Sequence, residues 1–307
     1  MDRGREPNHA GAEHRDACAR PRGIDCCHDA DRLSGTKLRR LRAQRRPPDV
    51  SSPATGPSVP AGPPRLGVVM LDTRFPRLPG DIGNPATFPG IAVDYRRVPH
   101  ATVARAVVAE APDAGLADAI VAAAADLHAA GADLIATSCG FLGILQARLE
   151  AAVLCPVIAS ALVRLPAIRR SVGADATIGI LTFDARKLGA HHFGVEAGPV
   201  AVRGIEAGTC LHPAIAGDRT WFDPDAARAD AVAAAESLKA AAPDMAAAVL
   251  ECTNLVPYRD AIALTLGVPL FDITAMIDAD LTVEQRGTSS RHGPELPESV
   301  APGMAIR

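Results

Sequence analysis

Two cysteines of this 307-residue chain each end a short apolar run that has the composition of a buried strand. Cys139 ends LIATSC and Cys252 ends AVLEC, and the two residues lie 113 positions apart. Each also directly precedes a predicted helix, whose N-terminus carries roughly half a positive charge and is expected to lower the thiol pKa from about 8.5. A thiolate opposed by a thiol can remove a proton from one face of a carbon and deliver one to the other face. The pair therefore predicts proton exchange at a single carbon.

An internal repeat gives the two cysteines equivalent positions. Four pairs of landmarks recur at an offset of 112 or 113 residues: Gly67 and Gly179, Asp72 and Asp184, Cys139 and Cys252, and Pro156 and Pro269. Each half is therefore predicted to be the same unit of strand–Asp, helix, strand–Cys, helix and Pro–strand. Ligands of parallel α/β sheets bind at the carboxyl ends of the strands. Two such units, packed about an approximate two-fold axis, would place one sulfur on each side of a shared crevice.

The elements that position these residues alternate between apolar strands and helices. Strands are predicted at 66–71, 134–137, 156–159, 178–182, 248–250 and 269–273, and helices at 114–130, 140–152, 224–241 and 255–266. Gly131 and Gly267 each follow a helix as its C′ residue, and Asp223 begins another helix as its N-cap. The alternation predicts an α/β fold of two pseudo-symmetric lobes, with mostly parallel sheets flanked by helices and the active site in the cleft between the lobes.

Composition and charge argue against several function classes. A net charge of -3 gives no reason to expect nucleic acid or an anionic membrane as a partner. No apolar run approaches the roughly 18 residues needed to span a bilayer, and no secretory signal is expected in the first 64 residues. Seven cysteines in a chain of this size do not form a disulfide framework, so a reducing cytoplasm is the expected location.

The two ends of the chain differ from its middle. Residues 1–64 contain 12 Arg or Lys and none of the ten aromatic residues, so they are predicted to be a disordered tail. Their cluster of Cys18, Cys26, Cys27 and His28 has a spacing that fits no metal site, and no metal is expected. Residues 65–281 are predicted to hold the two lobes, about 66–165 plus 255–281 and about 166–254, and residues 282–307 a flexible C-terminal tail.

Two motifs identify a family resemblance. TSCGF (Thr137–Phe141) and LECTN (Leu250–Asn254), with an opening strand that ends at Asp72, resemble the aspartate/glutamate racemase superfamily over about 66–281. The resemblance implies a racemase of amino-acid metabolism that needs no cofactor, acts on a small carboxylate and has Cys139 and Cys252 as its catalytic residues. It also implies a homodimer. The substrate-binding positions that it implies are Asp72, Thr73, Asn84, Thr137, Ser138, Gly140, Thr182, Thr253 and Asn254.

The sequence departs from the glutamate racemases at both cysteines. Those enzymes typically have Asn-Thr around the first cysteine and a histidine two residues after the second, where this chain has Gly140-Phe141 and Asn254. Hydantoin-racemase-like and maleate-isomerase-like activities therefore stay open as alternatives. Arylmalonate decarboxylases keep only the second cysteine, so the presence of both argues against that branch.

Other mechanisms find little support in the sequence. A pyridoxal phosphate enzyme needs a Schiff-base lysine, and the predicted folded region contains only Lys187 and Lys239. Lys187 could instead pair with a second carboxylate of the substrate. His191 and His192 have no partner in the repeat and are expected in an exposed loop. A catalytically silent protein that binds a small acid on the same scaffold is the alternative from another class, although a binding protein has no need of two opposed thiols.

Overall fold

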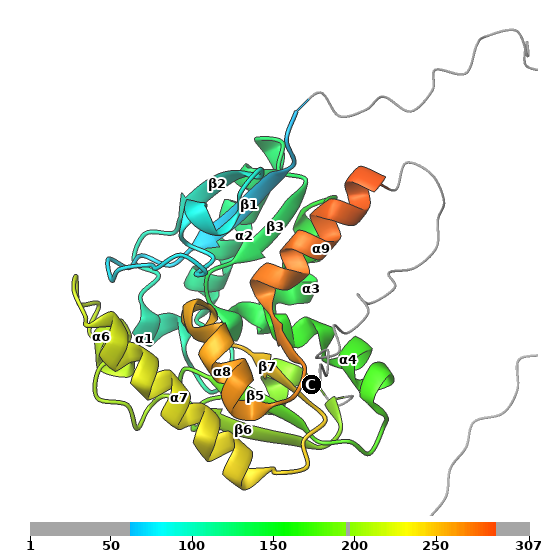
Figure 1. The fold of residues 1–307 in the computed structure, drawn as a ribbon. Coiled ribbons are helices and arrows are strands. Elements are labelled where there is room, and N and C mark those ends of the chain that lie inside the picture. Colours follow the sequence, from blue (N-terminus) through cyan, green and yellow to red (C-terminus); the bar gives the residue numbers. More distant parts are fainter. Residues whose placement is uncertain (1–61, 195–196, 287–307) are drawn as a thin grey trace, which may run out of the picture. The chain divides into compact units, whose positions relative to one another are not determined.

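The computed structural model describes residues 62–194 and 197–286, and within this part of the chain the strands form two four-stranded sheets (Figure 1). All the strand pairs in both sheets are parallel. The strands are β1 (Arg65–Met70), β2 (Ala92–Arg97), β3 (Leu134–Thr137), β4 (Val157–Ile158), β5 (Ile178–Thr182), β6 (Val200–Gly204), β7 (Ala247–Leu250) and β8 (Leu270–Asp272). The predicted α/β class with parallel sheets is confirmed.

The two sheets have the same strand order, as the internal repeat predicts. The first sheet is β2-β1-β3-β4 and the second is β6-β5-β7-β8. β1 and β5 are equivalent central strands, and each cysteine follows the strand that pairs with one of them. The sequence analysis missed β2 and β6. Both occupy a sheet edge, each contains at least one charged residue, and none of their residues is fully buried, so neither has the buried apolar run by which the other strands were predicted.

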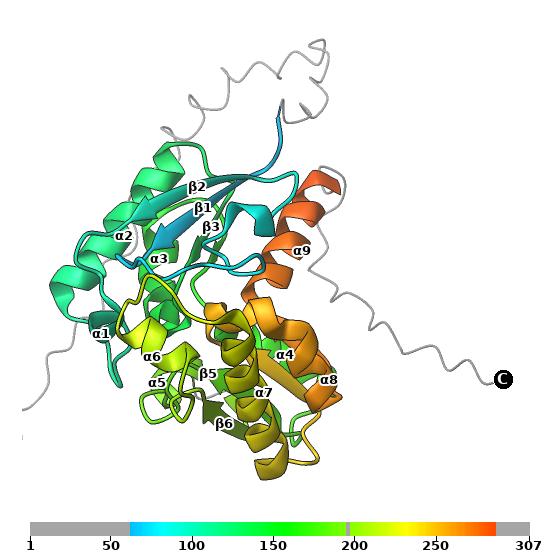
Figure 2. The same cartoon turned by 60° about the vertical axis from the view of Figure 1, so that its left-hand side comes forward.

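Helices cover the sheets (Figure 2). They are α1 (Val103–Ala106), α2 (Ala114–Ala129), α3 (Gln146–Ala152), α4 (Leu165–Val172), α5 (Ala190–Phe193), α6 (Leu211–Ala216), α7 (Pro224–Ala241), α8 (Arg259–Leu266) and α9 (Ile273–Arg286). α2 packs against β1, β2 and β3, whereas α7 packs against β5, β6 and its neighbour α8. No helix of the described residues is long and apolar enough to cross a membrane.

The glycine repeated in the two central strands allows these helices to pack closely. A Cβ atom on Gly67 of β1 would lie 3.0 Å from the Cβ of Leu127 on α2. The equivalent atom on Gly179 of β5 would lie 2.9 Å from Cδ2 of Leu238 on α7. The first distance is tighter than most Cβ contacts and the second is shorter than real Cβ atoms show, so each glycine lets one helix approach the middle of its sheet.

The C-terminal elements differ from their predicted assignment. β8 pairs with β7 in the second sheet. Residues 255–272 therefore belong to the second lobe and not to the first, in agreement with the order of elements in the repeat. Only α9 returns to the first lobe, where it contacts β3 and where Asp280 pairs with Arg164. α9 continues to Arg286, beyond the predicted boundary at residue 281. Nearly all of the predicted N-terminal tail, with its cysteine cluster, and residues 287–307 lie outside the described part.

Candidate functional site

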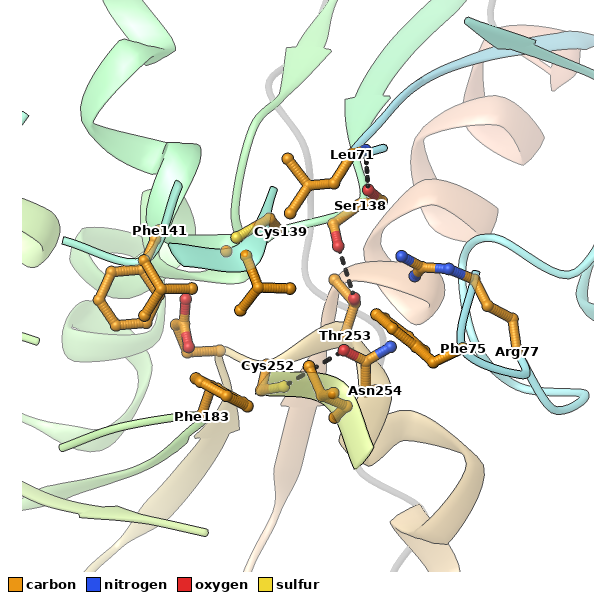
Figure 3. Close-up of a pocket in the computed structure, with 15 residues that line it drawn as sticks. Leu71, Phe75, Arg77, Ser138, Cys139, Phe141, Phe183, Cys252, Thr253 and Asn254 are labelled. Atoms are coloured by element: carbon orange, nitrogen blue, oxygen red, sulfur yellow. Dashed lines mark hydrogen bonds between the residues drawn. The ribbon is translucent and has the colours of Figure 1, made fainter. Parts of the chain in front are cut away.

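The two cysteines line one pocket, to which each sheet contributes one of them (Figure 3). Cys139 follows the carboxyl end of β3 and Cys252 that of β7, with one residue between strand and cysteine in each case. Each cysteine is the N-cap of a short 3₁₀ helix, η2 (Gly140–Leu145) or η5 (Thr253–Tyr258). The pocket encloses about 350 Å³ and is partly open to solvent.

Most of the pocket wall is apolar. Its apolar and aromatic residues are Leu71, Phe75, Val103, Val107, Phe141, Phe183 and Ile215. The remaining lining residues, apart from the cysteines, are Arg77, Ser138, Gly140, Glu251, Thr253 and Asn254. Of the nine predicted binding residues, four line the pocket: Ser138, Gly140, Thr253 and Asn254. All four are within two residues of a cysteine, and the other five do not line the pocket.

The environment of the thiols differs from the expected one. Burial and, as the second cause, the nearby Glu251 carboxyl together raise the pKa of Cys139 to about 12, although backbone N–H groups and the Arg77 guanidinium act in the opposite direction. Burial also raises the pKa of Cys252 well above its ordinary value, again with Glu251 as the second cause. The expectation that a helix N-terminus lowers both pKa values is therefore wrong, because loss of solvent outweighs the few N–H groups of a 3₁₀ turn.

The small polar residues beside the cysteines connect the two halves. The Thr253 hydroxyl donates to the Ser138 carbonyl at 3.0 Å, and the Ser138 hydroxyl accepts from the Leu71 backbone at 3.0 Å. Asn254 donates through Nδ2 to Asp81 at 2.5 Å, and its Oδ1 lies 3.8 Å from the Cys252 sulfur, which donates to it. These contacts fix the loops that carry the thiols.

A loop after β1 supplies a charged pair that the sequence analysis missed. Asp81 is buried, the Arg77 side chain is 9% exposed, and the two form an ion pair at 3.0 Å. The Arg77 guanidinium lies 4.6 Å from the centre of the Phe75 ring. Arg77 lines the pocket with Phe75, whereas Asp81 stands behind it. Neither residue belongs to a strand, a helix or the repeat. Their spacing of four residues in a Gly- and Pro-containing loop was the only signal.

Glu251, the residue before Cys252, is a second missed residue of the pocket. Its side chain is 1% exposed, and Oε2 accepts a hydrogen bond from the Thr182 hydroxyl at 2.6 Å. Oε1 has no hydrogen-bond partner among the described residues and lies against Gly140 of the other half, where a Cβ atom would overlap with it. Burial raises the pKa of this carboxyl to about 7. Its place in LECTN, next to the cysteine, could have drawn attention to it.

The other predicted binding residues lie behind the pocket wall. Thr137 is buried and donates to the Ala159 carbonyl at 2.7 Å, and the Thr73 hydroxyl accepts from Arg77 at 3.2 Å. Asp72 accepts from the backbone of His100 at 3.0 Å. Asn84 caps the 3₁₀ helix η1 (Pro85–Thr87), and Thr182 holds Glu251. None of these five residues lines the pocket, so each acts on it at most through a neighbour.

Two histidines pack behind the pocket phenylalanines. His192 is buried, in contrast to the expected exposed loop, and its ring meets Phe141 edge-on at 4.9 Å between centroids. The ring of His212 stacks on Phe183 at 4.4 Å. Lys187 donates to the Val107 carbonyl at 3.2 Å and does not line the pocket. The histidines therefore hold the orientation of two aromatic side chains.

One residue of the second half anchors the loop that carries Phe75 and Arg77. Asp218 accepts from the backbone N–H groups of Arg74 and Phe75 and pairs with the Arg74 side chain at 3.0 Å. Asp218 adopts a φ of 48°, a left-handed conformation that few residues other than glycine tolerate and that Asp adopts more readily than most. This wall of the pocket is thus held in place by both halves.

By sequence, the chain is similar to two curated proteins that are both named as dimethylsulfoniopropionate lyases. Dimethylsulfoniopropionate lyase of Durusdinium sp. clade D is 28% identical over 177 residues, which cover 53% of this chain and 56% of that protein. Dimethylsulfoniopropionate lyase 6 of Emiliania huxleyi (strain CCMP1516) is 31% identical over 221 residues, which cover 68% and 57%. The chain therefore spans little more than half the length of the curated relatives it matches. No protein-family model matches the chain.

Solved structures with a similar arrangement include unliganded arylmalonate decarboxylase, 15% identical with a TM-score of 0.47, covering 75% of this chain and 97% of that one. Glutamate racemase from Francisella tularensis subsp. tularensis SCHU S4, in complex with D-glutamate, is 14% identical with a TM-score of 0.48, covering 76% and 86%. Allantoin racemase from Pseudomonas fluorescens is 15% identical with a TM-score of 0.45, covering 77% and 100%. These matched proteins belong to the Asp/Glu/hydantoin racemase-like superfamily.

Proposed function

We propose that this protein is an enzyme that removes the proton from the carbon next to the carboxylate of a small acid, and that its substrate carries a cationic leaving group one carbon further on, as dimethylsulfoniopropionate does. The observation that carries the proposal is the single pocket lined by Cys139 and Cys252. The names of the two curated relatives support elimination as the outcome of proton removal. No cofactor takes part in the proposed reaction.

The proposed reaction is a β-elimination. A cysteine thiolate takes the proton from the α-carbon, and the electron pair of that C–H bond becomes the second bond between the α- and β-carbons. The bond from the β-carbon to the sulfonium sulfur breaks, and its electron pair leaves with dimethyl sulfide. Acrylate remains, and the thiol returns its proton to water before the next turnover. Charge and atoms balance without an oxidant or reductant.

A cationic substrate would bring a positive charge close to the two thiols. Burial and Glu251 keep both thiols protonated, as their raised pKa values indicate. An opposite charge within about 4–6 Å favours the ionised form of a group. A sulfonium in the pocket would therefore make a thiolate easier to form at the moment when the substrate is bound. An amino acid, whose carboxylate and ammonium charges lie next to each other, offers less of this effect.

The pocket also offers a place for the substrate carboxylate. Arg77 lines the pocket near Ser138 and Asn254, and a guanidinium forms strong charge-assisted hydrogen bonds with carboxylates. Arg77 is already paired with Asp81, which fixes the guanidinium on the pocket wall. We place the carboxylate at this end, with the α-carbon between the sulfurs.

Racemisation or a related isomerisation is the second candidate, and a specific observation favours it. A thiol from each half lines the same pocket, and exchange between two faces of a carbon needs two such groups whereas elimination needs one base. Both reactions begin with the same α-carbanion. A carbanion with a leaving group on the β-carbon eliminates it, whereas a carbanion without one is protonated again, which gives racemisation. The predicted amino-acid, hydantoin and maleate substrates belong to this candidate, and so does the predicted homodimer.

The test uses the purified full chain in deuterated water. Dimethylsulfoniopropionate, D- and L-amino acids, hydantoins and maleate are supplied separately. Dimethyl sulfide is measured by gas chromatography, and deuterium at the α-carbon is measured by NMR. Release of dimethyl sulfide, abolished in the Cys139→Ser, Cys252→Ser double variant, supports the lyase. Deuterium uptake with inversion of an amino acid or hydantoin, or isomerisation of maleate, supports the second candidate instead. If no compound reacts and one of them raises the melting temperature, the protein is a binder and both enzyme proposals fail.

A further inference from the structure

We propose that Glu251, Phe141 and Phe183 form a subsite for the methylated cationic group of the substrate, at the end of the pocket opposite Arg77. The inference rests on the proposed function, because it names where the cation of such a substrate lies. It assigns a role to a buried carboxyl group that proton transfer between the cysteines and a small acid does not use.

The first observation is an unpartnered carboxyl oxygen. Glu251 is 1% exposed, and its Oε2 accepts a hydrogen bond from the Thr182 hydroxyl. Oε1 has no partner among the described residues, although a buried acceptor without a hydrogen bond or a counter-charge is costly. Oε1 also lies against Gly140, at the entrance of η2, where only glycine leaves room for it. The buried, unpaired Oε1 is therefore available to interact with a cationic group of a ligand.

The second observation is a pair of phenylalanines, each of which directly follows a residue that contacts the Glu251 carboxyl group. Phe183 follows Thr182, whose hydroxyl donates to Glu251, and Phe141 follows the glycine that Oε1 contacts. Both rings line the pocket, and both are fixed from behind by a histidine ring. Figure 3 shows Phe141 and Phe183 on one side of the two cysteines, with Arg77 on the other. The pocket thus has an aromatic end and a guanidinium end.

These groups suit a methylated onium better than a primary ammonium. A sulfonium or quaternary ammonium has no N–H to donate, and aromatic faces together with a nearby carboxylate stabilise it. A primary ammonium would require about three acceptors, and this end of the pocket presents one free carboxyl oxygen among its described residues. The subsite therefore favours a zwitterion whose cation is methylated and lies apart from its carboxylate.

The charge of the subsite depends on its ligand. Burial raises the pKa of Glu251 to about 7. The titratable groups that face it are the thiols of Cys139 and Cys252, and His192 and His212 lie behind the two rings. A bound cation favours the carboxylate form, so cation binding releases a proton from Glu251 below this pH.

The experiment measures binding rather than turnover, by calorimetry at pH 7.5. N,N,N-trimethyl-β-alanine keeps the carboxylate and a methylated cation but has a poor leaving group. Its neutral isostere is 4,4-dimethylpentanoate. We expect the wild type to bind the cationic compound roughly tenfold or more tighter than the isostere. Glu251→Gln should reduce this preference to within about threefold and leave the affinity for the isostere unchanged, because the change removes only the charge.

Two further variants make the result independent of folding defects. Phe183→Leu should also reduce the preference, with a smaller loss than Glu251→Gln. Glu236→Gln makes the same chemical change at an exposed position of α7 and should preserve the preference in full. A wild type without preference, or a preference that survives in Glu251→Gln, overturns the subsite.

The same set of measurements separates the two proposals. If the preference depends on Glu251 but no dimethyl sulfide is released from dimethylsulfoniopropionate, the cation subsite stands and the lyase proposal fails. If dimethyl sulfide is released while Glu251→Gln keeps the preference, the lyase stands and the subsite fails.

Discussion

The two halves of the molecule repeat the same strands and the same cysteine, yet they differ in the residues around it. At the offset of the repeat, Ser138 of the first half corresponds to Glu251 of the second, and Met70 corresponds to Thr182. The buried pair of Glu251 and Thr182 therefore exists in the second half alone. The first half accommodates this acid at Gly140, because the absence of a side chain there leaves the space that the Glu251 carboxyl group fills.

The difference shows how a duplicated fold can produce a pocket with distinct ends. The first half contributes the loop with Arg77, and the second half contributes an acid. A pocket with two equal halves would accept a substrate in either of two orientations. This pocket has the Arg77 guanidinium on one side of the cysteines and the Phe141 and Phe183 rings on the other (Figure 3). The Glu251 carboxyl group contacts the residues that precede these two rings, so a zwitterion with separated charges has one favoured orientation.

The largest expected effect concerns the cysteines themselves. Arg77 lowers the pKa of Cys139 in part, whereas Cys252 has no such help, so we expect Cys139 to be the base. Cys139→Ser should lower dimethyl sulfide release about 10³-fold, and Cys252→Ser clearly less. Initial rates by gas chromatography measure both. Equal losses in the two variants would indicate that the halves act alike, as racemisation requires.

The next effect is a pH-dependent gain in stability from Glu251→Gln. The pKa of Glu251 rises from an ordinary 4.5 to about 7 in the fold, so the neutral acid is favoured there. The preference of the fold for the protonated Glu251 carboxyl adds to the free energy of unfolding. This contribution is fully present below pH 4.5 and is lost as the pH rises through about 7. At about 1.4 kcal/mol per pKa unit, this loss amounts to about 3 kcal/mol.

Urea unfolding at pH 4.5 and pH 8.5 measures this effect. Gln has no charge to bury, so the variant should gain about 3 kcal/mol relative to the wild type between the two pH values. Ser138→Ala, at the corresponding position of the first half, should show no such pH dependence. A constant difference between Glu251→Gln and the wild type would mean that the carboxyl group is not desolvated.

Gly140→Ala should disturb the contact between the halves. The added Cβ would overlap with the carbonyl oxygen and Oε1 of Glu251, and overpacking of this kind costs about 2 kcal/mol. Gly189→Ala is the matched control, because a Cβ there meets nothing within 4 Å. Denaturant midpoints of the two variants should differ accordingly, and equal midpoints would show that the halves are not tightly docked at Gly140.

The smallest effect compares the aspartates that end the two central strands. Asp184 is buried and holds Arg186, which lowers its pKa, whereas Asp72 is half-exposed. Asp184→Asn should cost about 1 kcal/mol at pH 7, a modest value because Arg186 is itself exposed. The cost should disappear as pH falls below about 3.8. Asp72→Asn should stay within about 0.5 kcal/mol in thermal melts, and the reverse order would contradict the described burial.

Much of the fold could be predicted from apolar runs and the repeat. The strands at 134–137 and 178–182 have the predicted bounds, because both are buried along their whole length. The helix predicted at 140–152 is instead the 3₁₀ helix η2 followed by α3. Apolar periodicity does not distinguish a 3₁₀ turn from an α turn over so short a span. The edge strands β2 and β6 were missed because edge positions admit charged side chains.

Residues of the site could be predicted only where their position in the pocket follows from the strand that precedes them in the sequence. The cysteines and their neighbours Ser138 and Asn254 reach the pocket because the ends of parallel strands meet there. Arg77 comes from a loop whose path depends on contacts with the other half. Glu251 stands next to a predicted residue, but its contact with Gly140 joins positions more than a hundred residues apart. Such contacts arise from tertiary packing and have no local pattern.

The anchoring of the Phe75 loop by Asp218 couples ligand affinity to the mutual docking of the two halves. The loop belongs to the first half and its acceptor to the second, so the wall exists in its described form only while the halves are in contact. By thermodynamic linkage, any molecule that binds against this wall must also strengthen that contact. A ligand of the pocket therefore acts as a reversible crosslink between the halves. The segment 173–177 joins α4 of the first half to β5 of the second, and its resistance to proteolysis reports how much of the protein has ligand bound.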